Sequence, residues 1–221
     1  MKTLIVLPAY NEAKVLSKTL TKLRKQAYTD LVVVDDGSGD STAEIAQREG
    51  AKVLRHPINL GLGAALETGL EYARRKGYDQ VVTFDADGQH NPKDISKLLK
   101  YLGEADVVIG VRVLNPEGMP AVKKLGNGLL NLLTGLIFGV YSKDSQSGLR
   151  AFNEKALDEV RVKANRYEVS SEILYEARRK GLKIVEVPVE VIYTKHSIAN
   201  GTTVVDGFKI LWRMLLHQRI R

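Results

Sequence analysis

The chain has 221 residues, of which 44% are hydrophobic and 27% charged, so it can bury a substantial core and is neither disordered nor fibrous. It contains no cysteine, which excludes disulfide bonds, thiolate catalysis and cysteine-bound zinc. The formal net charge of +7 favours anionic partners such as nucleotide phosphates and lipid headgroups, and because no nucleic-acid-binding motif accompanies it we expect no nucleic-acid partner.

The first half of the chain alternates short apolar runs with amphipathic helical patterns. The runs predict strands at Leu4–Leu7, Leu31–Val34, Lys52–Leu54, Gln80–Phe84 and Asp106–Ile109. The patterns between them predict helices near 12–26, 41–49, 62–76 and 92–102, with Asp40 and Asn91 as N-caps and Pro92 at a first helical position. This alternation predicts an α/β fold with a mostly parallel central sheet covered by helices.

The second half is less regular. Its patterns predict a helix over 121–140, a strand at Leu149–Phe152, a helix near 168–180, a strand at Lys183–Ile192 and a terminal helix over 206–221. Nothing marks a domain boundary, so we expect a single domain, 1–221, whose nucleotide-binding half (1–110) and acceptor half (111–221) share one sheet. There is no run of 18 apolar residues and no signal-peptide pattern, so we expect neither a membrane span nor a leader.

In open α/β sheets, ligands bind beyond the carboxyl ends of the strands, so the residues after each apolar run are candidates for a site. Tyr10 and Glu12 follow the first strand, where a ring could stack on a base and a carboxylate could accept from a ribose or cap the next helix. Asp35 and Asp36 follow the second strand, where adjacent carboxylates are costly unless something binds them. We interpret Asp36 as a ligand for a nucleoside and Asp40 as a helix cap, with an Asx turn as the alternative.

The fourth strand leads into Asp85-Ala-Asp87, which places two carboxylates near one ligand. Hard divalent cations are commonly held by one or two carboxylates together with substrate phosphates, and Gln89 adds a carbonyl oxygen. A polar turn is the alternative, but the two other acidic strand ends favour a metal site. We expect His90 to orient Gln89. The remaining histidines are expected to be ordinary polar residues: His56, His196 and His217.

Several motifs follow one another along the chain. The first four are Pro-Ala-Tyr-Asn-Glu at 8–12, Val-Asp-Asp-Gly-Ser-Gly-Asp-Ser-Thr at 34–42, Asn-Leu-Gly-Leu-Gly-Ala at 59–64 and Asp-Ala-Asp-Gly-Gln-His at 85–90. Gly-Val-Arg at 110–112, Asp-Ser-Gln-Ser-Gly-Leu-Arg-Ala-Phe at 144–152 and Glu-Val-Ser-Ser-Glu at 168–172 continue the series. Their order and spacing resemble glycosyltransferase family 2, in particular its dolichol-phosphate mannosyltransferase-like members. The resemblance implies the Rossmann-like GT-A fold of nucleotide-diphospho-sugar transferases.

The resemblance also implies roles for individual residues. It implies nucleoside contacts for Pro8, Tyr10, Glu12, Val34 and Asp36. It implies that Mg²⁺ or Mn²⁺ is held against the donor's diphosphate by Asp85, Asp87 and Gln89, with Ala86 in the same substrate-binding turn. Phosphate groups are expected near Arg112 and Arg150. Lys195 stands where many relatives carry an arginine, whereas Asn200 stands where they carry a lysine.

The activity that the resemblance implies is inverting, metal-dependent transfer of a sugar from a UDP- or GDP-linked donor to a polyprenyl phosphate. The residues expected to take part in catalysis are Asp87, Arg112, Asp144, Arg150 and Glu172. An ionised phosphate acceptor needs no strong base, whereas a saccharide hydroxyl, the alternative acceptor, needs one, for which the candidates are Glu172 and Asp144. A sugar nucleotidyltransferase is a further alternative, but it would carry a Gly-rich basic loop where this chain has residues 8–12.

The C-terminal segment 207–221 is basic and amphipathic and contains the tryptophan. Such a helix can lie on an anionic bilayer or pack against the body of the protein, and both readings stay open. With the apolar, glycine-containing stretch 125–141, it leads us to expect a cytoplasmic enzyme bound peripherally at the inner face of the membrane. A non-enzymatic membrane adaptor is the remaining alternative, and it leaves the three acidic strand ends unexplained.

Overall fold

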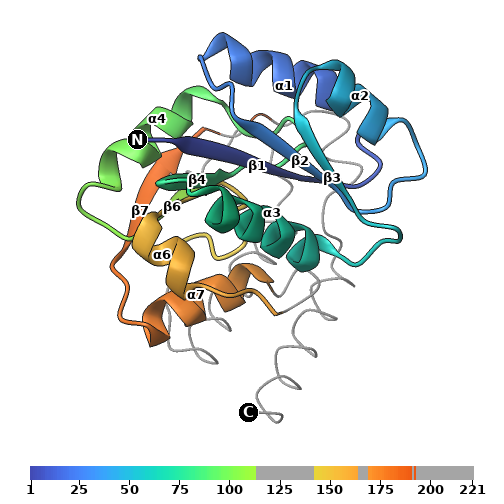
Figure 1. Ribbon diagram of the computed structural model, residues 1–221. Helices are drawn as coiled ribbons and strands as arrows, with labels where there is room; N and C mark the ends of the chain where they lie inside the picture. Colours follow the sequence, from blue (N-terminus) through green and yellow to red (C-terminus); the bar gives the residue numbers. More distant parts are fainter. Residues whose placement is uncertain (113–141, 164–168, 191, 193–221) are drawn as a thin grey trace, which may run out of the picture.

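The computed structural model describes residues 1–112, 142–163, 169–190 and 192. These residues form one seven-stranded sheet with helices on both faces (Figure 1), in the strand order β3-β2-β1-β4-β6-β5-β7. The strands are β1 (Thr3–Ala9), β2 (Leu31–Asp35), β3 (Lys52–Arg55), β4 (Gln80–Thr83), β5 (Val107–Arg112), β6 (Arg150–Asn153) and β7 (Ile184–Val189). The helices are α1 (Leu16–Lys25), α2 (Thr42–Arg48), α3 (Leu62–Lys76), α4 (Lys93–Tyr101), α6 (Glu154–Glu159) and α7 (Val169–Arg179).

The sheet is mostly parallel, as predicted. β1 pairs in parallel with β2 and β4, β2 pairs in parallel with β3, and β5 pairs in parallel with β7. The exception is β6, which runs antiparallel between β4 and β5. A strand from the second half of the chain is thereby inserted between two strands of the first half. The ends of β6 are consequently reversed relative to those of its neighbours, which matters for the site.

Two apolar cores hold the sheet between its helices. Along β1, Leu4 and Val6 face the core that α3, α6 and α7 cover, whereas Ile5 and Leu7 face the core under α1, α2 and α4. This is the two-residue alternation of a strand buried on both faces, and it explains why β1 reads as a continuous apolar run. The cores fix the sheet, and the loops at its carboxyl edge are left to carry polar side chains.

The predicted strands and helices that fall within the described residues are present, with ends shifted by up to a few residues. The side chains of Asp40 and Asn91 accept the N–H of the first residue of α2 and of α4. The N-cap positions are Ser41 and Pro92, one residue after the predicted caps, so the cap predictions are wrong by one residue. The predicted helices over 121–140 and 206–221 lie outside the described residues. None of the described helices has the length and hydropathy needed to cross a bilayer.

The short helix α6 was not predicted. Its N-cap is Asn153, whose side-chain oxygen accepts the N–H of Ala156 at 2.8 Å. Six residues are too few for a periodic apolar pattern, so the capping asparagine was the available signal.

Candidate active site

The carboxyl ends of β1, β2 and β4 lie at one edge of the sheet, and the reversed strand β6 begins at that same edge. The first residue of β6, Arg150, pairs in register with Thr83, the last residue of β4. Arg150 also pairs with Ile109 of β5. The antiparallel insertion therefore places an arginine beside the acidic turn that follows β4.

Asp85, two residues after β4, is held by groups from two parts of the chain. Its Oδ2 lies 3.0 Å from Nε2 of His90. Its carboxylate also rests against Gly148, because a Cβ at that glycine would lie 2.1 Å from both carboxylate oxygens. The hydroxyl of Thr83 donates to the carbonyl of Gly148 at 2.8 Å, which fastens the turn containing Gly148 to the end of β4.

Asp87 and Gln89 form a compact turn. Oδ1 of Asp87 accepts the backbone N–H of Gln89 at 2.9 Å, and Oδ2 accepts the Gln89 side-chain amide at 2.5 Å. The backbone carbonyl of Gln89 accepts the N–H of Ile192 at 2.8 Å, so the chain after β7 is attached to the same turn. The expectation that His90 orients Gln89 is wrong, because the His90 ring contacts Asp85 instead.

The two carboxylates have opposite electrostatic environments. Burial, and then the negative charge of Asp85, raise the pKa of Asp87. Burial opposes ionisation of Asp85 as well, but the hydrogen bond and charge of His90 and the charge of Arg150 outweigh it, so the pKa of Asp85 is lowered. The two carboxylates repel each other, and a cation bound between them would remove that repulsion.

The donor set fits a divalent cation that completes its coordination with substrate oxygens. Within the described residues, no three His, Asp or Glu side chains converge closely enough to hold a metal by themselves. Mg²⁺ in particular is usually held by one or two carboxylates plus phosphate oxygens and water. Asp85 and Asp87 supply two carboxylates on one turn, which matches that pattern.

Arg150 is a fully buried cation at the centre of this arrangement. Burial lowers its pKa to about 10, while the charges of Asp85 and Asp144 oppose that shift. The guanidinium therefore remains protonated at neutral pH. Its Nε and Nη2 have no hydrogen-bond acceptor among the described residues, so this buried cation retains donors for an anion.

Arg112 and Asp144 form a two-point ion pair. Nε and Nη2 of Arg112 lie 2.5 and 2.6 Å from the two oxygens of Asp144, and the Arg112 backbone N–H also donates to Asp144. Asp144 is almost fully buried. The carboxylate of Asp144 therefore orients the Arg112 side chain. The catalytic roles predicted for Arg112 and Asp144 remain predictions.

The predicted nucleoside contacts lie around β1 and β2. Pro8 and Val34 are opposite each other in register, and the Val34 side chain is fully buried in the core. Tyr10 is 48% exposed at the end of β1, where its ring is accessible to a ligand. The Glu12 backbone N–H donates to the Thr42 hydroxyl at 2.9 Å, which ties the loop after β1 to the start of α2.

Asp36 is nearly buried, and its carboxylate is bound by groups of the chain itself. It accepts the backbone N–H groups of Leu60 and Gly61 just before α3, and it contacts the ring of His56. The prediction that His56 is an ordinary polar residue is wrong, because it is buried and both ring nitrogens have partners. A hollow of about 300 Å³ lies beside it, lined by Gly37, Ser38, Arg55, His56 and Pro57.

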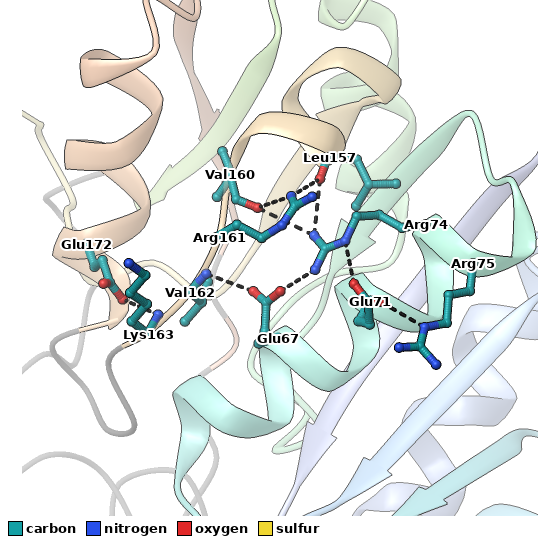
Figure 2. Close-up of polar contacts among 10 residues, drawn as sticks. All are labelled: Glu67, Glu71, Arg74, Arg75, Leu157, Val160, Arg161, Val162, Lys163 and Glu172. Atoms are coloured by element: carbon teal, nitrogen blue, oxygen red, sulfur yellow. Dashed lines mark hydrogen bonds and ion pairs between the residues drawn. The ribbon is translucent and has the colours of Figure 1, made fainter.

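Glu172 lies in the first turn of α7, and Figure 2 shows it reaching the chain that follows α6. Its Oε2 accepts the backbone N–H of Lys163 at 3.0 Å. On the opposite side of this segment, Glu67 of α3 accepts the N–H of Val162 at 2.7 Å. Glu172 therefore has a structural role, whereas its predicted catalytic role is untested. Lys195 lies outside the described residues.

Sequence reasoning did not single out Gly148 or His56. Gly148 lies inside the motif at 144–152, but its contact is with Asp85, more than 60 positions earlier in the chain. His56 comes directly after β3, and that place at a strand end was the available signal.

Comparison with known proteins agrees with the fold and with the motifs. Residues 4–161 match the family model described as Glycosyl transferase family 2. A UDP-N-acetylglucosamine–dolichyl-phosphate N-acetylglucosaminyltransferase of Methanococcus voltae is 41% identical over 96% of this chain and 94% of its own. An undecaprenyl-phosphate mannosyltransferase of Micrococcus luteus is 32% identical over 87% of this chain and 84% of its own.

Solved structures share the fold. Glucosyl-3-phosphoglycerate synthase from Mycobacterium tuberculosis, in complex with Mn²⁺, uridine diphosphate and glucosyl-3-phosphoglycerate, superposes with a TM-score of 0.73. The alignment covers 97% of this chain and 77% of that one at 21% identity. This likeness shows that the sheet and helices of the chain have the GT-A arrangement.

Proposed function

Because the chain belongs to glycosyl transferase family 2 and is a glycosyltransferase, we propose that it transfers a sugar from a nucleoside diphosphate sugar to a polyprenyl phosphate, with inversion and with a bound divalent cation. The two relatives above support the acceptor, since they are named for dolichyl phosphate and undecaprenyl phosphate. The fold neighbour that binds uridine diphosphate and Mn²⁺ supports the donor class and the cation.

The observation that carries this proposal is the placement of Arg150 beside Asp85 at the end of β4. The diphosphate gains negative charge as its bond to the sugar breaks, so it requires positive charge close to its oxygens. The buried guanidinium has donors without acceptors among the described residues, and two carboxylates beside it suit a cation. Arginine is well suited to phosphate because its planar group donates two parallel hydrogen bonds.

Asp85 and Asp87 would hold the cation, with the Gln89 side chain in the same turn. When bound, Mg²⁺ or Mn²⁺ neutralises charge on the departing diphosphate as a Lewis acid. The protein keeps Asp85 in place through His90 and through its contact with Gly148. His90 comes from the turn after β4 and Gly148 from the segment before β6, so two parts of the chain position this carboxylate.

The nucleoside of the donor would lie at the ends of β1 and β2. The exposed ring of Tyr10 offers a stacking surface, and Asp36 offers a carboxylate to a base N–H or a ribose hydroxyl. Pro8 and Glu12 would complete the contacts, whereas Val34, whose side chain is buried in the core, would take part only through its backbone. Both UDP- and GDP-linked donors suit these groups, and a test with both bases distinguishes them.

In the reaction, a phosphate oxygen of the acceptor attacks the anomeric carbon from the face opposite the leaving diphosphate. One carbon–oxygen bond forms as the bond to the nucleoside diphosphate breaks, which inverts the configuration. The acceptor oxygen is already ionised near neutral pH, so no strong base is required. This agrees with carboxylates of Asp144 and Glu172 that are engaged with Arg112 and with the Lys163 backbone.

We place the enzyme at the cytoplasmic face of the membrane, bound peripherally. A polyprenyl phosphate is embedded in the bilayer, so the active site must approach the lipid surface. The basic segment 207–221 would contribute roughly 1 kcal/mol per Lys or Arg near an anionic leaflet.

The cation is tested with Asp87→Asn. We expect this change to lower kcat by about a hundredfold or more, because Asp87 would hold the cation that stabilises the negative charge developing on the diphosphate in the transition state. Transfer from labelled UDP- and GDP-sugars to a short-chain polyprenyl phosphate, with Mn²⁺ or with excess EDTA, is the measurement. The exposed Asp158→Asn on α6 is the matched control and should behave as wild type. Full turnover of the wild type in excess EDTA would refute the metal role.

A further inference from the structure

A chain of three side chains connects the end of β2 to α3. Nδ1 of His56 lies 2.7 Å from Oδ1 of Asp36, and Nε2 lies 2.9 Å from the hydroxyl of Thr68. The side chains of Asp36 and His56 are only 5% and 10% exposed. Such buried polar contacts are short and directional, so each group restricts the orientation of the next.

The positions of the ring protons follow from the chemistry of the partners. An ionised carboxylate only accepts, so Nδ1 of His56 must carry a hydrogen and donate it to Asp36. In the neutral ring Nε2 is then an acceptor, and the hydroxyl of Thr68 donates to it. This assignment gives each ring nitrogen a matching partner.

The Asp36 carboxylate is nearly saturated by the protein. Oδ1 accepts from His56 and from the N–H of Leu60 at 2.9 Å, and Oδ2 accepts from the N–H of Gly61 at 2.8 Å. A carboxylate offers about four acceptor positions. Counting the described residues, the one position left to a ligand is on Oδ2.

Asp36 is also beside the predicted stacking residue. Its backbone N–H donates to the carbonyl of Ala9 at 2.8 Å, and the chain continues from Ala9 into Tyr10. A base lying on the Tyr10 ring would therefore be bound close in the fold to the residue that carries this carboxylate. Which oxygen it meets depends on the rotation of that carboxylate.

We propose that His56 is a positioning residue for the donor nucleoside, acting through Asp36. Its ring N–H occupies Oδ1 and holds the carboxylate so that Oδ2 is presented to the base or ribose, while Thr68 holds the ring. The inference rests on the proposed function, since it requires a nucleoside at the ends of β1 and β2. It extends that function to two residues, His56 and Thr68, to which the motifs assign no role.

A positioning role for the nucleoside has a specific kinetic signature. The nucleoside is bound equally in the ground state and in the transition state, because no bond to it changes in the reaction. Loss of its positioning therefore raises KM for the donor, with little change in kcat. KM for the polyprenyl phosphate should not change.

Two substitutions at position 56 distinguish the hydrogen bond to Asp36 from a purely steric role of the His56 side chain. The side-chain amide of Asn can place its N–H near the position of Nδ1, whereas that of Gln reaches toward the position of Nε2. We therefore expect His56→Asn to stay within about threefold of wild type in affinity for UDP or GDP, and His56→Gln to lose about tenfold or more, as for a lost buried hydrogen bond to a charged group. Asp36→Asn is measured in parallel as the direct reference.

Calorimetry with UDP and with GDP, each with Mn²⁺, gives the affinities, and circular dichroism confirms folding. If His56→Gln binds nucleotide as tightly as wild type while Asp36→Asn is weakened, the inference is overturned and the proposed function stands. If the wild type binds neither nucleotide, the proposed function itself fails. Should His56→Gln not fold, Thr68→Val decides: a loss of about threefold or more supports the inference, and unchanged affinity overturns it.

Discussion

At the scale of single residues, the site is built from charged groups whose partners come from distant parts of the chain. Asp85 is positioned by His90 on one side and by the bare backbone of Gly148 on the other. A glycine is required there for space, since its backbone is in an ordinary conformation and no other side chain leaves room for the carboxylate. The consequence is that a single methyl group can disturb the site without disturbing the fold.

Gly148→Ala should therefore weaken metal-dependent nucleotide binding. The added Cβ would lie 2.1 Å from the Asp85 oxygens, and the carboxylate, as the end of a flexible side chain, must rotate away. We expect at least a tenfold loss in affinity for UDP or GDP with Mn²⁺, which is the size of effect that a lost charged contact has. Calorimetry and thermal melting are the measurements.

Gly103→Ala is the matched control, because its Cβ would meet only the Lys100 carbonyl, at an ordinary 3.7 Å. Binding and melting of that variant should equal wild type. A Gly148→Ala protein that binds nucleotide normally would show that Asp85 has no fixed position in the site.

At the scale of elements, a polar clamp joins α3 to the segment after α6. Figure 2 shows Arg74 of α3 paired with Glu67 and Glu71 while it also reaches the carbonyls of Leu157 and Val160. The Arg74 side chain is 8% exposed, so these contacts are largely removed from water. They satisfy carbonyl groups at the end of α6 that the helix itself leaves without partners.

Replacement of the buried guanidinium should destabilise the fold and leave donor binding intact. We expect Arg74→Met to lower the free energy of unfolding by about 2 kcal/mol, because Glu67 loses the cation that it is paired with in a largely buried place. The carbonyls of Leu157 and Val160 each lose one donor and keep the other, Arg161. Urea unfolding gives this value, and KM for the donor should not change, since none of the predicted donor contacts belongs to the clamp.

The neighbouring Arg75→Met is the control. Arg75 pairs with Glu71 from the exposed face of the same helix, with its side chain 77% exposed. Exposed pairs of this kind contribute little, so no measurable loss of stability is expected. If both variants were destabilised equally, the loss of stability would come from replacing Arg with Met in a helix and not from breaking the clamp.

At the scale of the whole molecule, the described residues of the two halves of the chain share one sheet. β6, from the second half of the chain, lies between β4 and β5 of the first half, and the sheet is continuous. The contacts of Glu67 and Glu172 with adjacent N–H groups add a second connection between α3 and α7. Both halves therefore belong to one sheet and one packed unit within the described residues.

Membrane attachment is expected to be separable from catalysis. Removal of segment 207–221 should reduce cosedimentation with anionic liposomes, because its basic residues are lost, while transfer to a short-chain polyprenyl phosphate in detergent should persist. Neutral liposomes are the control for charge. Absence of liposome binding by the full chain, together with efficient transfer to a soluble saccharide, would refute the lipid acceptor and direct attention to Glu172 or Asp144 as a base.

The local pattern of the sequence by itself determined the strands, most of the helices, the acidic strand ends and the family. These features can be recognised because the period of a strand or helix is visible in a short stretch of sequence, and because Asp36, Asp85 and Asp87 all come shortly after the end of an apolar run. Tertiary structure alone decided which distant groups meet them. The direction of β6 brings Arg150 to Asp85, and the packing of α3 on the sheet brings Thr68 to His56, which in turn contacts Asp36. Strand order and direction depend on how both faces of the sheet are buried. Because that burial involves the whole chain, no short stretch of sequence reveals it.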